Sequence, residues 1–280
     1  MSFHDFLNDP DFDDTYGPDT LTVRYYFKNW VETAESSAML PEVNLSVFNI
    51  HTIPPLPDSI TKLTVGNDYL VYIPQSSIPK NLESFSLRKS PNVRRIPAMP
   101  NSLKNLAISN NRQINKLPSL PVGIKHISAS GTNITTVQWL YTGIVSLTLS
   151  GCPVRKLPFK HMPSTLKFLD ISGTHITVLP NIGCRLEYLN ISNTKITVLP
   201  PFPISLTTLF CHTCHLVIPS GDIDLRSLEK LREYGMLWLE WHSEKQKQER
   251  QNARFEMIKI ELLQAFYKKM DSKNMEYCST

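Results

Sequence analysis

The sequence predicts an α/β solenoid, a stack of short repeats that share one parallel sheet. Two observations carry this prediction. A leucine or isoleucine opens the same apolar pattern every 20 to 22 positions, at Leu40, Ile60, Leu82, Leu103, Ile124, Ile144, Leu166, Leu186 and Leu206. In most repeats prolines follow the pattern at a density that excludes a helix and favours polyproline II. Because the repeats follow one another at a constant spacing, they predict a single elongated body in which each repeat buries its apolar face against its neighbours.

Numbered from these starts, the repeats follow the pattern L-x-x-L-x-L-x-x-(N/D/T/C)-x-L. Positions 4 and 6 have the spacing of a strand, so their side chains point into the interior while positions 3, 5 and 7 face solvent. Position 9 holds a small polar or thiol side chain that can bond the buried turn from inside. These side chains are Asp68, Asn111, Thr132, Cys152, Thr174, Thr194 and Cys214. The pattern is the leucine-rich-repeat signature. It predicts a horseshoe with short parallel strands on the concave face and an extended, polyproline convex side.

Such a stack needs a cap at each end. Residues 1–19 form an acidic leader, which we expect to be disordered. Residues 20–39 carry apolar side chains at helical spacing behind Thr20 as the N-cap, and they predict an N-terminal helical cap. Residues 40–219 hold the nine repeats. Residues 220–280 predict a C-terminal helical region with a second apolar stripe over residues 255–270.

The charge distribution argues against a nucleic-acid groove. Residues 1–39 hold 8 acidic and 2 basic side chains, whereas residues 40–219 hold 6 acidic and 16 basic side chains. Of those cations only Lys62 and Arg88 fall on outward strand positions, and a groove needs aligned cations with aromatic partners. No window of about 18 apolar residues predicts a membrane span. Since the N-terminus also lacks a basic-then-apolar signal sequence, we expect a soluble protein of the cytoplasmic type.

The segment Cys211-His212-Thr213-Cys214-His215 matches the C-x-x-C-H pattern of haem attachment. We favour a role in the core, because Cys211 and Cys214 are positions 6 and 9 of the ninth repeat. A zinc site from these thiols and a histidine is the intermediate option, but structural zinc needs four ligands and no second pair follows. We expect no metal, no cofactor and no enzyme activity, since no nucleophile, base and orienting group are grouped beyond what repeat position explains.

Outward positions near the C-terminal end of the sheet predict a partner-binding site. Aromatic and polar side chains there would lie on adjacent strands about 5 Å apart, whereas the N-terminal half shows mainly small groups. The predicted site consists of Phe168, Asp170, Tyr188, Asn190, Phe210 and His212. Aromatic anchors ringed by polar groups are typical of protein-binding surfaces. The alternative is that the C-terminal cap folds over these aromatic side chains and buries them.

Three features point to a known family. The repeats are short and carry the Leu-Pro-x-x-Pro-x-Ser-Leu segment, as in residues 199–206. Residues 25–32 are similar to a Y-Y-x-x-W helix that precedes such repeats, and residues 6–10 lie in a similar leader. In these features the chain resembles the leucine-rich-repeat effectors of type III secretion in Gram-negative pathogens, of the Yersinia outer protein M type. Some of them append a ubiquitin ligase domain with a C-x-D motif, and no cysteine here has Asp two residues on.

The resemblance implies a non-enzymatic virulence effector that is secreted into the host cytoplasm and grips host proteins through its concave face. The residues alone imply a rigid protein-binding platform. Large DNA viruses and amoebal genomes encode repeats of similar spacing, and a viral source would remove the secretion inference. The alternative function is a structural protein that self-associates through its C-terminal helices.

Overall fold

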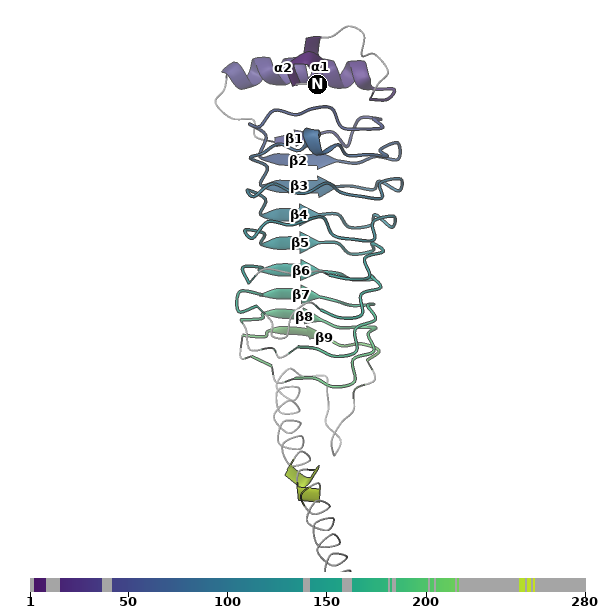
Figure 1. Ribbon diagram of the computed structural model, residues 1–280, viewed down its shortest axis with the longest axis vertical. Helices are drawn as coiled ribbons and strands as arrows, with labels where there is room; N and C mark the ends of the chain where they lie inside the picture. The colour runs from purple at the N-terminus through teal and green to yellow at the C-terminus, as the bar shows by residue number, and fades with distance from the viewer. Residues whose placement is uncertain are drawn as a thin grey trace, which may run out of the picture. The chain divides into compact units, whose positions relative to one another are not determined.

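The computed structural model contains a sheet of nine short strands that lie side by side in sequence order (Figure 1). Nearly all described residues fall in the first of two compact units, residues 1–217 and 218–280. The structure describes residues 3–8, 16–36 (side chains to 29), 42–137, 142–157, 163–180, 182, 185–200, 202–203, 205–214, 216, 247–249, 251–252 and 254.

Every strand is parallel to its neighbours in the sheet. The strands are β1 (Glu42–Asn44), β2 (Lys62–Val65), β3 (Ser84–Leu87), β4 (Asn105–Ala107), β5 (His126–Ser128), β6 (Ser146–Thr148), β7 (Phe168–Asp170), β8 (Tyr188–Asn190) and β9 (Thr208–Phe210). Position 4 of each repeat pairs with position 4 of the next, from Val43 with Leu63 to Leu189 with Leu209. The predicted one strand per repeat is confirmed.

The interior is built from positions 1, 4, 6 and 11 of most repeats; in the third and fourth repeats Val93 and Ile114, one residue later, take the place of position 11. In the seventh repeat these are Leu166, Leu169, Ile171 and Ile176, and each is 0% exposed. The strand residues on either side of Leu169 are only half-buried, which is the alternation expected of a strand with one face in the core. Full burial of such a side chain stabilises the fold by about 1.5–3 kcal/mol. Because each repeat is covered by its neighbours, this stabilisation depends on the stack.

The second proline of the Leu-Pro segment forms the turn that starts the next repeat. Its carbonyl accepts a hydrogen bond from the position-1 amide three residues on, as from Leu103 to Pro100 at 3.1 Å. The hydroxyl that precedes position 1 links two repeats, since Ser102 Oγ donates to Leu82 O at 2.8 Å. The Pro-x-Ser-Leu part therefore closes one repeat and joins it to the one before. Within the described repeats the only helix after a strand is the 3-10 helix η1 (Gln75–Ser77), as expected for extended segments.

Position 9 bonds the buried turn from inside, as the sequence predicts. The hydroxyls of Thr132, Thr174 and Thr194 donate to the carbonyl three residues back at 2.8, 2.7 and 2.7 Å. Cys152 Sγ instead reaches Ala129 O of the preceding repeat, at 3.1 Å. These four turns are thus held by side chains within the core.

The prediction for Asp68 is wrong. Its side chain is exposed, and the neighbouring Asn67 makes the turn bonds in its place. Asn67 Oδ1 accepts from the amides of Tyr69 and Leu70 at 2.7 and 2.8 Å, and its Nδ2 donates to Phe48 O. The physical reason is that an amide supplies both a donor and an acceptor to a buried turn, whereas an ionised carboxylate supplies acceptors only.

Two helices precede the first strand, α1 (Phe3–Asn8) and α2 (Thr20–Ser36). The sequence does not predict α1, which falls in the range expected to be disordered. Phe6 explains its order, because the ring is fully buried with centroids 5.2 Å from Tyr16 and 6.4 Å from Phe27. Apolar contact to α2 outweighs the acidic composition there.

Thr20 is the first residue of α2 rather than its N-cap. The Asp19 carbonyl accepts the first helical bond from the Val23 amide at 2.9 Å, and the buried Thr20 hydroxyl donates to Gly17 O at 2.6 Å. Asp19 therefore holds the N-cap position. The Thr20 side chain is fully buried, and its hydroxyl is used in the bond to Gly17 O rather than to cap the helix.

The N-terminal segment is bonded to the first repeat. Tyr26 of α2 packs edge-on against Phe48, with centroids 5.4 Å apart. Asp19 Oδ2 accepts from the Asn49 amide at 2.7 Å, and Tyr16 O accepts from the His51 amide at 2.6 Å. The predicted C-terminal helices, including the stripe over residues 255–270, lie almost wholly outside the described residues.

Candidate partner-binding surface

The aromatic residues predicted at the C-terminal end of the sheet form a continuous row. Phe168 on β7 stacks on Tyr188 on β8, with centroids 4.1 Å apart and planes within 8°. Phe210 on β9 lies 5.8 Å from Tyr188, and His212 lies 6.0 Å from Phe210. The stack follows from the strand register, which pairs Phe168 directly with Tyr188. With Asp170 and Asn190 these residues are called the C-terminal patch below.

The patch grows more exposed toward the last strand. Phe168 and Tyr188 are half-buried, Phe210 keeps 39% of its surface exposed, and His212 is exposed. Among the described residues, the other exposed large apolar side chains are either aliphatic or, like Tyr25, Tyr69 and Tyr72, belong to the N-terminal part of the chain. The row is therefore an apolar surface next to water within the described part of the chain.

Asp170 and Asn190 have a structural role in addition to their place in the patch. Asp170 Oδ1 accepts from the amide and hydroxyl of Ser172 at 3.0 and 2.7 Å. Asn190 Oδ1 accepts from the Ser192 amide at 3.1 Å. Both side chains thus form Asx turns that fix the backbone where their strands end. Ser172 and Ser192, which hold position 7 of their repeats, are the donors to these turns.

The Tyr188 phenol is held in its neutral form. Burial raises the pKa of Tyr188 above the usual tyrosine value, and the nearby Asp170 carboxylate raises it further against the effect of a hydrogen bond with Asn190. A neutral phenol can both donate and accept a hydrogen bond. The middle of the aromatic row therefore carries one polar group that a partner could bond.

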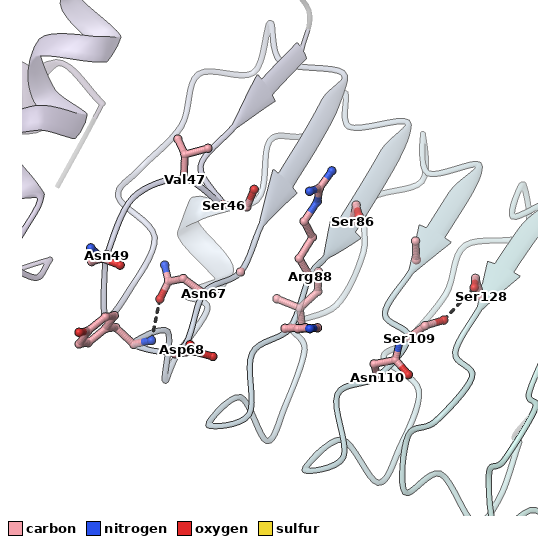
Figure 2. A pocket seen from close by; sticks show the side chains of 15 residues that line it. Ser46, Val47, Asn49, Asn67, Asp68, Ser86, Arg88, Ser109, Asn110 and Ser128 are labelled. Carbon is pink, nitrogen blue, oxygen red and sulfur yellow. Dashed lines mark hydrogen bonds between the residues drawn. The ribbon is translucent and has the colours of Figure 1, made fainter.

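The structure also contains a groove over β1 to β5 that sequence reasoning missed. It has a volume of about 720 Å³, and its floor carries the small side chains Ser86, Ala107 and Ser128. Figure 2 shows the extended Arg88 side chain beside Ser86, and the bonded hydroxyls of Ser109 and Ser128, 2.8 Å apart. The sequence signal was present, because small residues at position 5 of three consecutive repeats leave a hollow next to a long side chain at position 7.

The two outward cations of the sheet differ in their surroundings. Lys62 Nζ lies 3.8 Å from a Glu42 carboxylate oxygen. Arg88 has no carboxylate within ion-pair distance among the residues that the structure describes. The two outward cations therefore differ in whether a carboxylate of the described residues partly neutralises them.

Both cysteines of the ninth repeat are only partly buried, whereas Cys152 of the sixth repeat lies fully in the core. Cys214 Sγ donates to Ile191 O at 3.1 Å, and Cys211 is partly buried. Burial raises the pKa of the Cys211 thiol, and the neighbouring Cys214 raises it further, so the thiolate that binds metals is disfavoured. In the described residues no three or more His, Cys, Asp or Glu side chains are grouped to hold a metal ion. None of the described helices has the length and apolarity to cross a membrane.

Comparison with known proteins bears on the repeats. The family model of the Leucine Rich Repeat matches residues 185–206, which include β8 and the turn into the ninth repeat. The nine strands described above repeat this unit in register. The repeats are leucine-rich repeats. No curated protein matches the chain. Among eighteen matching chains of solved structures is YopM from Yersinia enterocolitica WA-314, 25% identical, with a TM-score of 0.48 and coverage of 61% of this chain and 42% of that one.

Leucine-rich repeats present a rigid strand face whose outward side chains vary from repeat to repeat, and such faces serve as protein-interaction scaffolds. Here the outward face has two distinct regions. The C-terminal patch is aromatic, whereas the groove over β1 to β5 combines small side chains on its floor with the long side chains of Arg88 and Lys89.

Proposed function

We propose that this chain is a non-enzymatic protein-binding scaffold and that the C-terminal patch is its contact site. The observation that carries the proposal is the row of Phe168, Tyr188 and Phe210 on three adjacent strands. Large aromatic side chains offer much contact area and lose little conformational freedom on binding. Because the paired sheet already fixes the positions of these side chains, the site is preorganised and binding a partner costs little further conformational entropy.

The surroundings of the row determine which partner fits. Asp170, Asn190 and His212 place polar groups beside the rings, and Tyr188 adds a neutral phenol. A partner segment with an apolar side chain at its centre and hydrogen-bond donors at its edge would match this arrangement. The stacked pair offers a flat contact surface, whereas the more exposed Phe210 can enter a pocket on the partner.

We further propose that the partner is a host protein and that the chain acts as a secreted effector. Support comes from the Leu-Pro-x-x-Pro-x-Ser-Leu segments and from residues 25–32, in which the chain resembles the type III secreted effectors. The Pro-x-Ser-Leu part of that segment has a physical role in each turn, through bonds such as Ser205 Oγ to Leu186 O at 2.8 Å. A secretion assay tests delivery into a host cell separately from partner binding.

The test of the binding site compares capture of proteins from eukaryotic cell lysate by wild type and variants. The combined variant Phe168→Ala, Tyr188→Ala and Phe210→Ala should lose a stoichiometric partner. Because the stacked pair contributes about 0.5–1.5 kcal/mol beyond its burial, the single variant Phe210→Ala is included as the change least harmful to the fold. The matched control is Val122→Ala with Val178→Ala, which removes apolar side chains that are 69% and 74% exposed elsewhere.

The outcomes separate the proposed functions. Loss of the partner in both patch variants with retention in the valine control supports the patch. Capture unchanged by the combined variant contradicts it. Recovery of this chain alone favours the structural alternative, self-association through residues 255–270, which Ile258→Asp with Leu262→Asp should then abolish.

A further inference from the structure

A pocket on the turn side of repeats 6 to 8 gathers positive charge. Its volume is about 390 Å³, and it is lined by Arg155, Lys156, His175, Thr177 and Lys195. All five residues are exposed and come from the turns that follow β6, β7 and β8. The His175 amide donates to Val154 O at 2.9 Å, which ties two of these turns together. The pocket is thus a feature of the stacked repeats and belongs to no single turn.

The lining of this pocket differs from the pattern of charges elsewhere on the chain. Lys104 and Lys167 each pair with a glutamate of an adjacent repeat, at 2.7 and 2.8 Å. No carboxylate lines the pocket described above, which is called the basic pocket below. In the described part of the chain, Arg155, Lys156 and Lys195 have no carboxylate within ion-pair distance. Their charges therefore remain available to an external anion.

Three permanent cations around one pocket act together on an anion. The three turns are stacked at about 5 Å per repeat, a spacing comparable to the Debye length of about 8 Å at physiological ionic strength, so the charges act on a common anion. Their mutual repulsion disfavours the free protein, and an anion in the pocket relieves it. The arrangement favours a ligand that carries several negative charges over one that carries a single charge.

We propose that this pocket binds a ligand with two or more phosphate groups. One phosphate monoester carries a charge of about −1.5 to −2 near neutral pH, so two are needed to balance the three cations. Arg155 offers a bidentate fork to phosphate oxygens, while Lys156 and Lys195 act as point charges. Small-molecule sites span about 300–1,000 Å³, and this pocket lies in that range. The residues that line it include no Phe, Tyr or Trp for stacking a base, so the phosphates themselves would be recognised.

Two sources present this chemistry, a soluble polyphosphorylated polyol and the headgroup of a phosphorylated inositol lipid. The first arm of the test is calorimetric titration of the full chain with inositol hexakisphosphate and with inorganic pyrophosphate. The second arm is co-sedimentation with phosphatidylcholine vesicles that contain phosphatidylinositol bisphosphate, with plain vesicles as the reference. Binding in solution alone assigns a soluble ligand, and retention on the charged vesicles assigns the lipid headgroup.

The pocket variant is Arg155→Gln with Lys156→Gln and Lys195→Gln. The control, Arg94→Gln with Arg95→Gln and Lys116→Gln, removes the same charge from exposed sites outside the pocket. We expect the pocket variant to bind inositol hexakisphosphate at least about 10-fold more weakly, which corresponds to about 1.4 kcal/mol. The control should stay within about 3-fold of wild type. Equal weakening in both variants would mean diffuse attraction to a basic surface and would overturn the proposal.

A melting curve guards against a trivial loss of structure. Since the pocket variant removes like charges that repel one another, it should melt at the same temperature as wild type or slightly higher while binding is lost. If that variant does not fold, the single change Lys195→Gln replaces it, with the single change Lys116→Gln as its control; Lys195→Gln should bind about 3-fold more weakly than Lys116→Gln, and equal binding by the two would overturn the proposal. The proposal is overturned if wild type binds none of the three probes, namely inositol hexakisphosphate, pyrophosphate and the charged vesicles. These results do not depend on the C-terminal patch, because no patch residue is changed.

Discussion

Replacing Asn111 by alanine should destabilise the chain more than any other change at position 9. Asn111 is fully buried, and its Nδ2 donates to Ile108 O at 2.8 Å and to Leu87 O of the preceding repeat at 3.1 Å. Its Oδ1 accepts from the Ser90 amide, also in the preceding repeat, at 2.8 Å. One side chain therefore satisfies backbone groups in two repeats, and Asn111→Ala removes all of these bonds.

The size of the loss follows from the groups left behind. Ser90 is 0% exposed, and its amide would become a buried donor without a partner, which costs about 1–3 kcal/mol. The bonds to the carbonyls of Ile108 and Leu87 contribute about 1 kcal/mol each. Asn111→Ala should thus lower the free energy of unfolding by about 3–5 kcal/mol. Asn111→Thr should recover about 1 kcal/mol, because threonine at this position bonds the carbonyl three residues back, as Thr174 does at 2.7 Å.

Urea unfolding followed by circular dichroism measures these differences, and hydrogen exchange of the Ser90 amide reads the same site locally. The exchange measurement matters because a repeat array can unfold in parts, so a single transition is not assured. Both variants should accelerate exchange at Ser90, since neither supplies its acceptor. A loss below about 1 kcal/mol for Asn111→Ala, or unchanged exchange at Ser90, would refute this account of position 9.

The other predictions concern backbone, turns and titration. Gly66→Ala should lower the free energy of unfolding by about 3 kcal/mol, because φ is +121° and the new β-carbon would lie 2.5 Å from Arg88 O. The control is Gly143→Ala, where the new β-carbon meets open space; its free energy of unfolding should stay within about 0.5 kcal/mol of wild type in the same urea titration. Ser102→Ala and Ser205→Ala should each cost about 1 kcal/mol through loss of the bond between repeats. Ultraviolet titration of wild type against Tyr188→Phe should show a phenol with a pKa above the usual value, and Asp170→Asn should lower that pKa in part. The stability that neutral Tyr188 contributes is present below the unfolded pKa of about 10 and is lost as pH rises through the folded pKa. Wild type should therefore lose more stability at high pH than Tyr188→Phe does, and an equal loss in the two proteins would contradict the shift.

The strands and the core could be predicted because the same spacing recurs in every repeat. Leu169 and Ile171 occupy positions whose direction is set by strand geometry alone, and both are 0% exposed. The same geometry placed Phe168 and Tyr188 side by side on the outward face. Outward position and register are consequences of the repeat, so the candidate site was predictable to the extent that it lies on strands.

Features outside the strands depend on contacts that a repeat pattern does not contain. Helix α1 is ordered by contacts of Phe3 and Phe6 with Phe27 of α2, and a six-residue segment is too short for its apolar spacing to predict a helix by itself. At the second repeat Asn67 replaces Asp68, next to a glycine with φ of +121°. The basic pocket joins side chains from three turns, and their common direction becomes visible only when the turns are stacked.

The most direct test of the binding site is site-specific photo-crosslinking with benzoylphenylalanine in place of single residues. Crosslinking from position 210 in the patch, where Phe210 is 39% exposed, is compared with crosslinking from position 178. Val178 is 74% exposed and lies in the extended segment of the seventh repeat, after the turn. The proposed function predicts that position 210 crosslinks to one partner protein in lysate while the more exposed position 178 does not. Crosslinks to the same protein from position 178, or none from position 210 while the partner is captured, would contradict a contact site at the C-terminal patch.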